Sequence, residues 1–128
     1  MPHLVATPLY TALLALLALV LSVRVIKVRQ SRKISLGTDG NEELTRAVRA
    51  HANLTEHMPL AILMMAFLEL NDGHAMALHA AGISLVVGRL VHAWALPAGW
   101  GQGRVAGMAL TFGSWIVLAL ANVATVLL

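Results

Sequence analysis

The sequence predicts an all-α fold, an integral membrane four-helix bundle that forms a single domain over residues 1–128. The chain is 59% hydrophobic and only 12% charged, with a mean hydropathy of +0.78. A soluble domain of this length cannot bury that much apolar surface. Four segments, at about 4–28, 42–70, 74–96 and 105–128, are long enough to cross a bilayer core of about 30 Å.

The first apolar segment runs from Leu4 to Val23 and contains no charged residue. Its length matches the roughly 20 residues that a transmembrane helix needs. A cleaved signal peptide is the competing interpretation. However, no lysine or arginine precedes the segment, and Arg24 stands where a small-residue cleavage site is expected. We therefore predict a retained membrane span.

A basic connection and a second helix follow the first span. The connection begins with five cations: Arg24, Lys27, Arg29, Arg32 and Lys33. Asp39 or Asn41 can cap a second helix over 42–70, because their side-chain oxygens accept hydrogen bonds from free N–H groups. Proline lacks an N–H and disturbs a helix, so we expect a kink at Pro59, near the membrane boundary.

The second half of the chain predicts two more spans. A short acidic turn at 69–73 leads into the third span at 74–96, whose many small residues favour close packing against neighbouring helices. This span ends at Pro97. A glycine-rich loop then reaches Arg104, and the uncharged segment 105–128 forms the fourth span.

The distribution of charge predicts how the bundle is oriented. All nine lysines and arginines lie in or near the first and third connections, whereas the second connection carries only Glu69 and Asp72. Cations favour the cytoplasmic side, so both termini should face away from the cytoplasm, in the inner membrane if the protein is bacterial. The pI of about 10.2 then reflects topology and attraction to anionic lipid. We therefore expect a lipid bilayer, not nucleic acid, as the partner.

A polar stripe lies along the second helix where it enters the membrane. Its members share one face by helical spacing and are Arg46, Arg49, Asn53 and Glu56, with His51 and His57 flanking them. A solvated helix face accounts for the first turn of this stripe. It does not account for Asn53 and Glu56, because ionisable groups near the membrane interior usually pair with one another or mark a functional site.

Arg89 and His92 lie three residues apart on the third helix, at the depth of Glu56 and His57. Two interpretations stay open: a functional site, or a simple interhelical ion pair between Glu56 and Arg89. A metal site is not expected, since His51 and His57 are six residues apart and miss the spacing of a helical ligand pair. The chain has no cysteine, so any thiol must come from a ligand.

These residues carry a resemblance. The segment Arg49-Ala-His-Ala-Asn53-Leu-Thr-Glu56-His-Met-Pro59 resembles the signature Arg-Ala-x-x-Asn-x-x-Glu-x-x-Pro of the MAPEG family, the membrane-associated proteins in eicosanoid and glutathione metabolism. The chain length, four spans, basic first loop and Arg-x-x-His turn agree as well. The resemblance, to a bacterial-type member, implies a homotrimer that binds glutathione between subunits near the cytoplasmic face. It also implies transferase or peroxidase activity on lipophilic electrophiles.

The resemblance also implies roles for individual residues. Arg49 and Glu56 hold the glutamyl and glycyl ends of glutathione, and Asn53 bonds its peptide group. The remaining expected contacts come from Arg46, His57, Arg89 and His92, with Arg104 as the catalytic residue that activates the thiol. The residue chemistry agrees, because guanidinium groups suit carboxylates, a carboxylate suits an ammonium, and a cation favours a thiolate.

The chain departs from the family pattern at two positions. Leu96 and His57 stand where many members carry a tyrosine, and the only tyrosine, Tyr10, lies in the first span. Two functions therefore stay open: a glutathione-dependent enzyme, or a non-catalytic member that binds a lipophilic ligand or partner. A transporter lacks support, because the chain has no inverted repeat. The sequence does not identify the second substrate.

Overall fold

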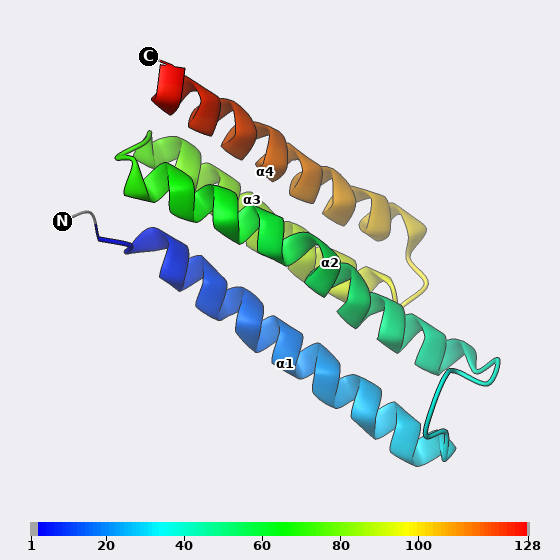
Figure 1. Ribbon diagram of the computed structural model, residues 1–128. Helices are drawn as coiled ribbons and strands as arrows, with labels where there is room; N and C mark the ends of the chain where they lie inside the picture. Colours follow the sequence, from blue (N-terminus) through cyan, green and yellow to red (C-terminus); the bar gives the residue numbers. More distant parts are fainter. Residues whose placement is uncertain (1–2, 128) are drawn as a thin grey trace.

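The computed structural model describes residues 3–127, which fold into four α-helices and contain no strand (Figure 1). These are α1 (Ala6–Arg32), α2 (Glu42–Leu70), α3 (Ala75–Ala95) and α4 (Gly101–Leu127). Helices α2 and α3 pack against each other and against both α1 and α4, while α1 and α4 lie on opposite sides without contact. The predicted all-α bundle is confirmed. Leu128, the last residue of the predicted fourth span, lies outside the described residues.

The helix boundaries agree with the sequence prediction in α2 and differ in α4. Asn41 caps α2, since its Oδ1 accepts a hydrogen bond from the Leu44 N–H at 2.9 Å. Helix α2 continues through Pro59 without a break. Helix α4 begins at Gly101 instead of residue 105, so Arg104 lies in the first turn of a helix and not in a glycine-rich loop.

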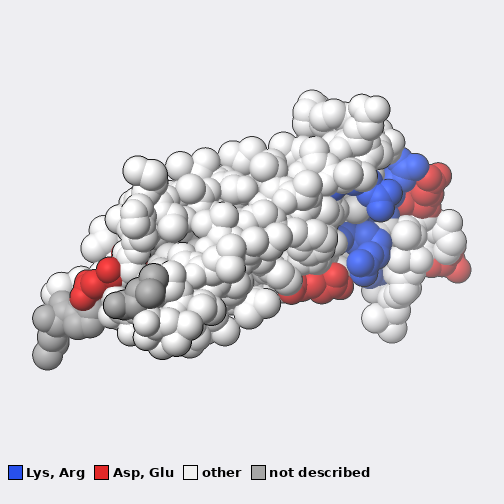
Figure 2. Space-filling model, turned by 90° about the horizontal axis from the view of Figure 1, so that it is seen from above, with Lys and Arg blue, Asp and Glu red and all other residues white. Residues whose placement is uncertain are grey.

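Three of the helices, α1, α3 and α4, are long and apolar enough to cross a membrane. Helix α2 is not among them, because its first half carries the polar stripe. Figure 1 shows α2 running back along α1 to the end of the bundle where α1 begins. That α2 crosses the membrane as well stays a prediction. In Figure 2 the lysine and arginine side chains gather at one end of the molecule, beyond a long uncharged middle.

Helix α3 packs closely on α4, and this packing brings the predicted site residues Arg89 and His92 against α4. A Cβ atom on Gly107 would lie 2.7 Å from the carbonyl oxygen of Gly88 and 2.9 Å from the backbone nitrogen of His92. The two backbones can therefore approach this closely only because both positions are glycine. The Ser84 hydroxyl adds a hydrogen bond to the Leu110 carbonyl oxygen at 2.9 Å.

At the end of the bundle that carries both termini, which we call the paired end, side chains join the helices (Figure 1). The carboxylate of Glu69 accepts backbone N–H bonds from Val5, Ala6 and Thr7, each at 2.7 Å. It thereby replaces the side-chain N-cap that α1 lacks. Tyr10 shares a hydrogen bond with Nδ1 of His79 at 2.9 Å, which joins α1 to α3.

Candidate functional site

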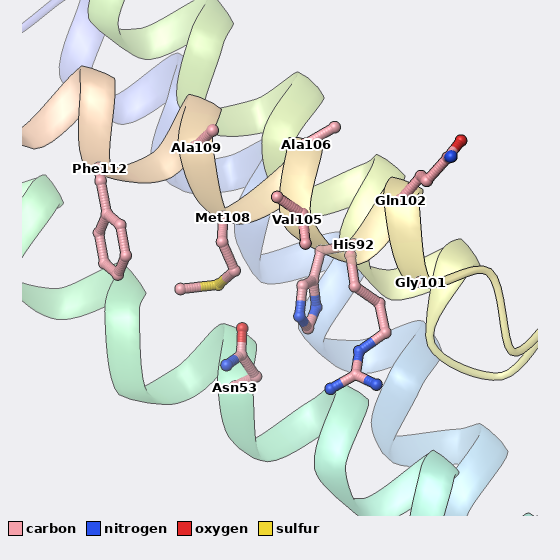
Figure 3. A pocket seen from close by; sticks show the side chains of 10 residues that line it. Asn53, His92, Gly101, Gln102, Val105, Ala106, Met108, Ala109 and Phe112 are labelled. Atoms are coloured by element: carbon pink, nitrogen blue, oxygen red, sulfur yellow. The ribbon is translucent and has the colours of Figure 1, made fainter.

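Two hollows meet at the opposite end of the bundle, which we call the loop end. The arginine pocket, of about 310 Å³, is lined by Thr45, Arg46, Arg49, Asn53, His92, Leu96, Gly99 and Arg104. The α2–α4 groove, of about 1170 Å³, is lined by Asn53, His92, Gly101, Gln102, Arg104, Val105, Ala106, Met108, Ala109 and Phe112 (Figure 3). Asn53, His92 and Arg104 line both hollows, so the two are adjacent.

Five residues predicted from the sequence come together in the arginine pocket, although they lie on three helices. Arg46, Arg49 and Asn53 share the face of α2 that their spacing predicted. His92 comes from the last turn of α3 and Arg104 from the first turn of α4. The tight crossing of α3 and α4 therefore places these two side chains opposite the α2 stripe.

The pocket is rich in positive charge. Arg46 pairs with Glu42, and NH1 of Arg49 lies 3.5 Å from a carboxylate oxygen of Glu56. The Arg49–Glu56 pair is 55% and 52% exposed, so a ligand can compete for either partner. Within residues 3–127, Arg104 has no acidic partner within ion-pair distance. Such an arrangement suits an anionic ligand.

Arg46 braces the connection between α3 and α4. Its guanidinium donates a hydrogen bond to the carbonyl oxygen of Pro97 at 3.4 Å. It also lies against Gly99, where a Cβ atom would be 3.0 Å from NH1 and the backbone φ is +70°. Glycine adopts this conformation without strain. Arg46 thus helps to hold the turn that leads to Arg104.

The structure places Arg89 behind the pocket. Its side chain is 1% exposed and lines neither hollow. NH1 donates to Oδ1 of Asn53 at 2.6 Å, and NH2 lies 3.3 Å from the carbonyl oxygen of Gly107. The alternative ion pair between Glu56 and Arg89 is not formed, because Glu56 lies on the exposed side of α2 and faces Arg49. A direct contact between Arg89 and glutathione stays a prediction.

His57 also lies outside both hollows and supports a wall. Its Nδ1 is 2.7 Å from the carbonyl oxygen of Asn53, which only accepts, so Nδ1 carries the proton. The imidazole packs against Phe112 and Trp115, with ring centroids 5.9 and 5.5 Å apart. Phe112 in turn lines the apolar end of the α2–α4 groove (Figure 3). A direct contact of His57 with glutathione stays a prediction.

Sequence reasoning missed the apolar part of the site. Val105, Met108, Ala109 and Phe112 recur at helical spacing on α4 and extend the groove away from Arg104. Helical spacing defined the polar stripe of α2 because its polar residues differ from the residues around them. Helix α4 is almost uniformly apolar, so the residues on its groove face do not differ from the rest of the helix. The result is one elongated site with a basic end and an apolar end.

Comparison with known proteins agrees with this architecture. The family model of the MAPEG family matches residues 7–124, from the first turn of α1 into the last turn of α4. Two similar curated proteins carry the name inner membrane protein YecN, one from Escherichia coli strain K12 and one from Escherichia coli O6:H1 strain CFT073. Each is 35% identical over 114 residues, which cover 89% of this chain and 87% of the relative.

Proposed function

This chain belongs to the MAPEG family, and from that premise we propose that it is a glutathione-dependent transferase or peroxidase for lipophilic electrophiles. It acts in a membrane, and its similarity to an inner membrane protein favours the inner membrane of a bacterium. Glutathione binds in the arginine pocket at the cytoplasmic face, which leaves both termini on the other side. The electrophile binds in the adjoining α2–α4 groove.

The observation that carries this proposal is the convergence of three arginines around Asn53, next to an apolar groove. Glutathione has two carboxylates, one ammonium, two peptide groups and one thiol. Arg46 and Arg49 can each hold a carboxylate, and the carboxylate of Glu56 can hold the ammonium. Because Arg49 and Glu56 are already neighbours, they are placed to bind the oppositely charged groups of one zwitterionic end.

Arg104 is the residue best placed to activate the thiol. It lines both hollows, so it stands where the sulfur of a ligand in the pocket meets a substrate in the groove. The positive end of the α4 dipole adds to its charge. Glutathione supplies a thiolate that forms a carbon–sulfur bond and displaces a leaving group such as halide, after the thiol proton has passed to solvent.

A homotrimer completes the site in this proposal. Arg49 and Glu56 are half exposed, and Phe112 is 47% exposed although it lies in an apolar helix. A neighbouring subunit covers this open side and excludes water from the thiolate, which strengthens its attraction to Arg104. Native mass spectrometry in detergent tests the assembly, and a spectrum with monomer alone contradicts it.

Thiolate absorbance tests the proposal directly. Purified protein in detergent is titrated with glutathione across pH, and conjugation to a chromogenic aryl halide is followed in parallel. We expect a thiolate signal and conjugation above the uncatalysed rate in wild type, and a raised thiol pKa in Arg104→Leu. Arg32→Leu, which removes a cation that lines neither hollow, serves as the matched control and should match wild type. No thiolate signal in wild type would favour a non-catalytic member that binds a lipophilic ligand.

A further inference from the structure

The guanidinium of Arg89 cross-links three helices in the interior of the bundle. From α3 it reaches Asn53 on α2 at 2.6 Å, and the carbonyl oxygen of Gly107 and the Sδ of Met108 on α4, each at 3.3 Å. The backbones of α3 and α4 approach closely at the neighbouring Gly88 and at Gly107. A charge buried this deeply is stable only while these hydrogen bonds persist.

The chemistry of the Arg89–Asn53 bond fixes the orientation of the Asn53 amide. A guanidinium has donors and no acceptor, so the amide atom that faces it has to be the oxygen. The Nδ2 group, with two donor hydrogens, therefore points away from Arg89. Asn53 lines both the arginine pocket and the α2–α4 groove, and within the described residues its Nδ2 group has no hydrogen-bond partner.

We propose that Arg89 is a positioning residue that holds the Asn53 amide with its Nδ2 donor toward the pocket, so that the ligand must present a hydrogen-bond acceptor there. A peptide carbonyl or carboxylate oxygen meets this requirement, whereas a donor such as an ammonium is rejected. The inference rests on the proposed function only in its choice of glutathione as the probe. The orientation itself follows from the contacts of Arg89.

The variant Asn53→Asp tests whether the ligand needs the Nδ2 donor. One carboxylate oxygen keeps the bond to Arg89, now with opposite charges, while the other oxygen replaces the donor that faces the pocket. We expect an unchanged or higher melting temperature and a glutathione dissociation constant raised at least about tenfold. Wild-type affinity in a stable Asn53→Asp protein would overturn the proposal.

Conservative rescue gives a second measurement. Arg89→Lys retains a cationic donor for Oδ1 of Asn53 and should keep glutathione affinity within about threefold of wild type. Arg89→Met removes the donor and frees the amide to rotate, so affinity should fall about tenfold. Equal affinities in the two folded variants would contradict the assigned role.

NMR of the ligand-free protein distinguishes a failure of this inference from a failure of the proposed function. Isotope-labelled asparagine gives side-chain signals for Asn41, Asn53, Asn71 and Asn122, and the signal lost in Asn53→Asp identifies Asn53. We expect Arg89→Met to shift this signal alone, in the absence of any ligand. An unshifted signal in a folded protein refutes the positioning role. A shift together with no glutathione binding by wild type refutes the proposed function instead.

Discussion

The paired end and the loop end of the bundle differ in whether their polar groups have partners within the protein. At the paired end, the Glu69 carboxylate is matched by three backbone donors, and Tyr10 is matched by His79. At the loop end, Arg104 has no acidic partner among the described residues, and Nδ2 of Asn53 has no hydrogen-bond partner among them. Both ends lie beside the same apolar middle, so the contrast does not come from the surroundings.

We interpret this difference as one between polar groups that stabilise the fold and polar groups that bind the proposed ligand. A polar group near the membrane is costly unless it is paired, so a chain that only needs to fold satisfies such groups internally. At the paired end, Glu69 and Tyr10 are satisfied in this way. The loop end has more cations than acidic partners, and some of these cations line the arginine pocket. Water can solvate these charges, and they suit an anionic ligand. Four predictions test this division.

The largest effect is expected at Glu69. Replacing it with Ala leaves the N–H groups of Val5, Ala6 and Thr7 without their charged acceptor, so the free energy of unfolding should fall by about 2 to 4 kcal/mol. Thermal unfolding in detergent, followed by tryptophan fluorescence, measures this loss. Asp72→Asn removes a neighbouring exposed charge and should change stability little. Glutathione affinity should stay unchanged, and a large loss of affinity would break the contrast between the ends.

Glu56→Gln should act on binding and hardly on stability. The amide keeps the size of the side chain but loses its charge, so glutathione should bind more weakly by about 1 to 3 kcal/mol. The melting temperature should change little, because the exposed pair with Arg49 contributes at most about 1 kcal/mol. Isothermal titration and thermal unfolding measure the two quantities. Unchanged affinity with a lowered melting temperature would assign Glu56 to the fold.

Tyr10→Phe should cost less than the Glu69 change. The ring remains packed beside Gly82, and only the hydroxyl bond to His79 is lost, so stability should decrease by about 0.5 to 1.5 kcal/mol. His79→Leu should have a similar cost, and the two changes together should cost less than their sum. Fully additive losses would show that the two side chains do not act as a pair.

The smallest effect is expected at Arg32. Its ion pair with Glu43 is about half exposed on both sides, so Arg32→Gln should change stability by less than about 0.5 kcal/mol. Denaturation of wild type and variant under identical detergent conditions provides the measurement. A loss above about 1.5 kcal/mol would mean that pairing at the loop end also supports the fold, which would weaken the division between the two ends.

Local signals in the sequence determined most of the helix boundaries and the composition of the α2 stripe. Asn41 was a candidate cap, and α2 begins and ends where the sequence indicates, because capping and turn formation depend on neighbouring residues. The start of α4 was placed too late. Gly103 suggested a loop, but a Cβ atom there would lie 2.2 Å from the ring of Trp100. This glycine provides space for the ring within a helix.

The contacts between helices could not be predicted from the sequence and were known only from the tertiary structure. The sequence placed Arg49, Asn53 and Glu56 on one face, because positions within a helix follow from its period. It did not reveal that Arg89 bonds Asn53 instead of Glu56, or that Glu69 accepts bonds from residues more than 60 positions earlier in the chain. Which side chains meet across an interface depends on the rotation and depth of each helix. Those are set by packing at contacts such as Gly88 and Gly107, and not by the residues that finally form the bond.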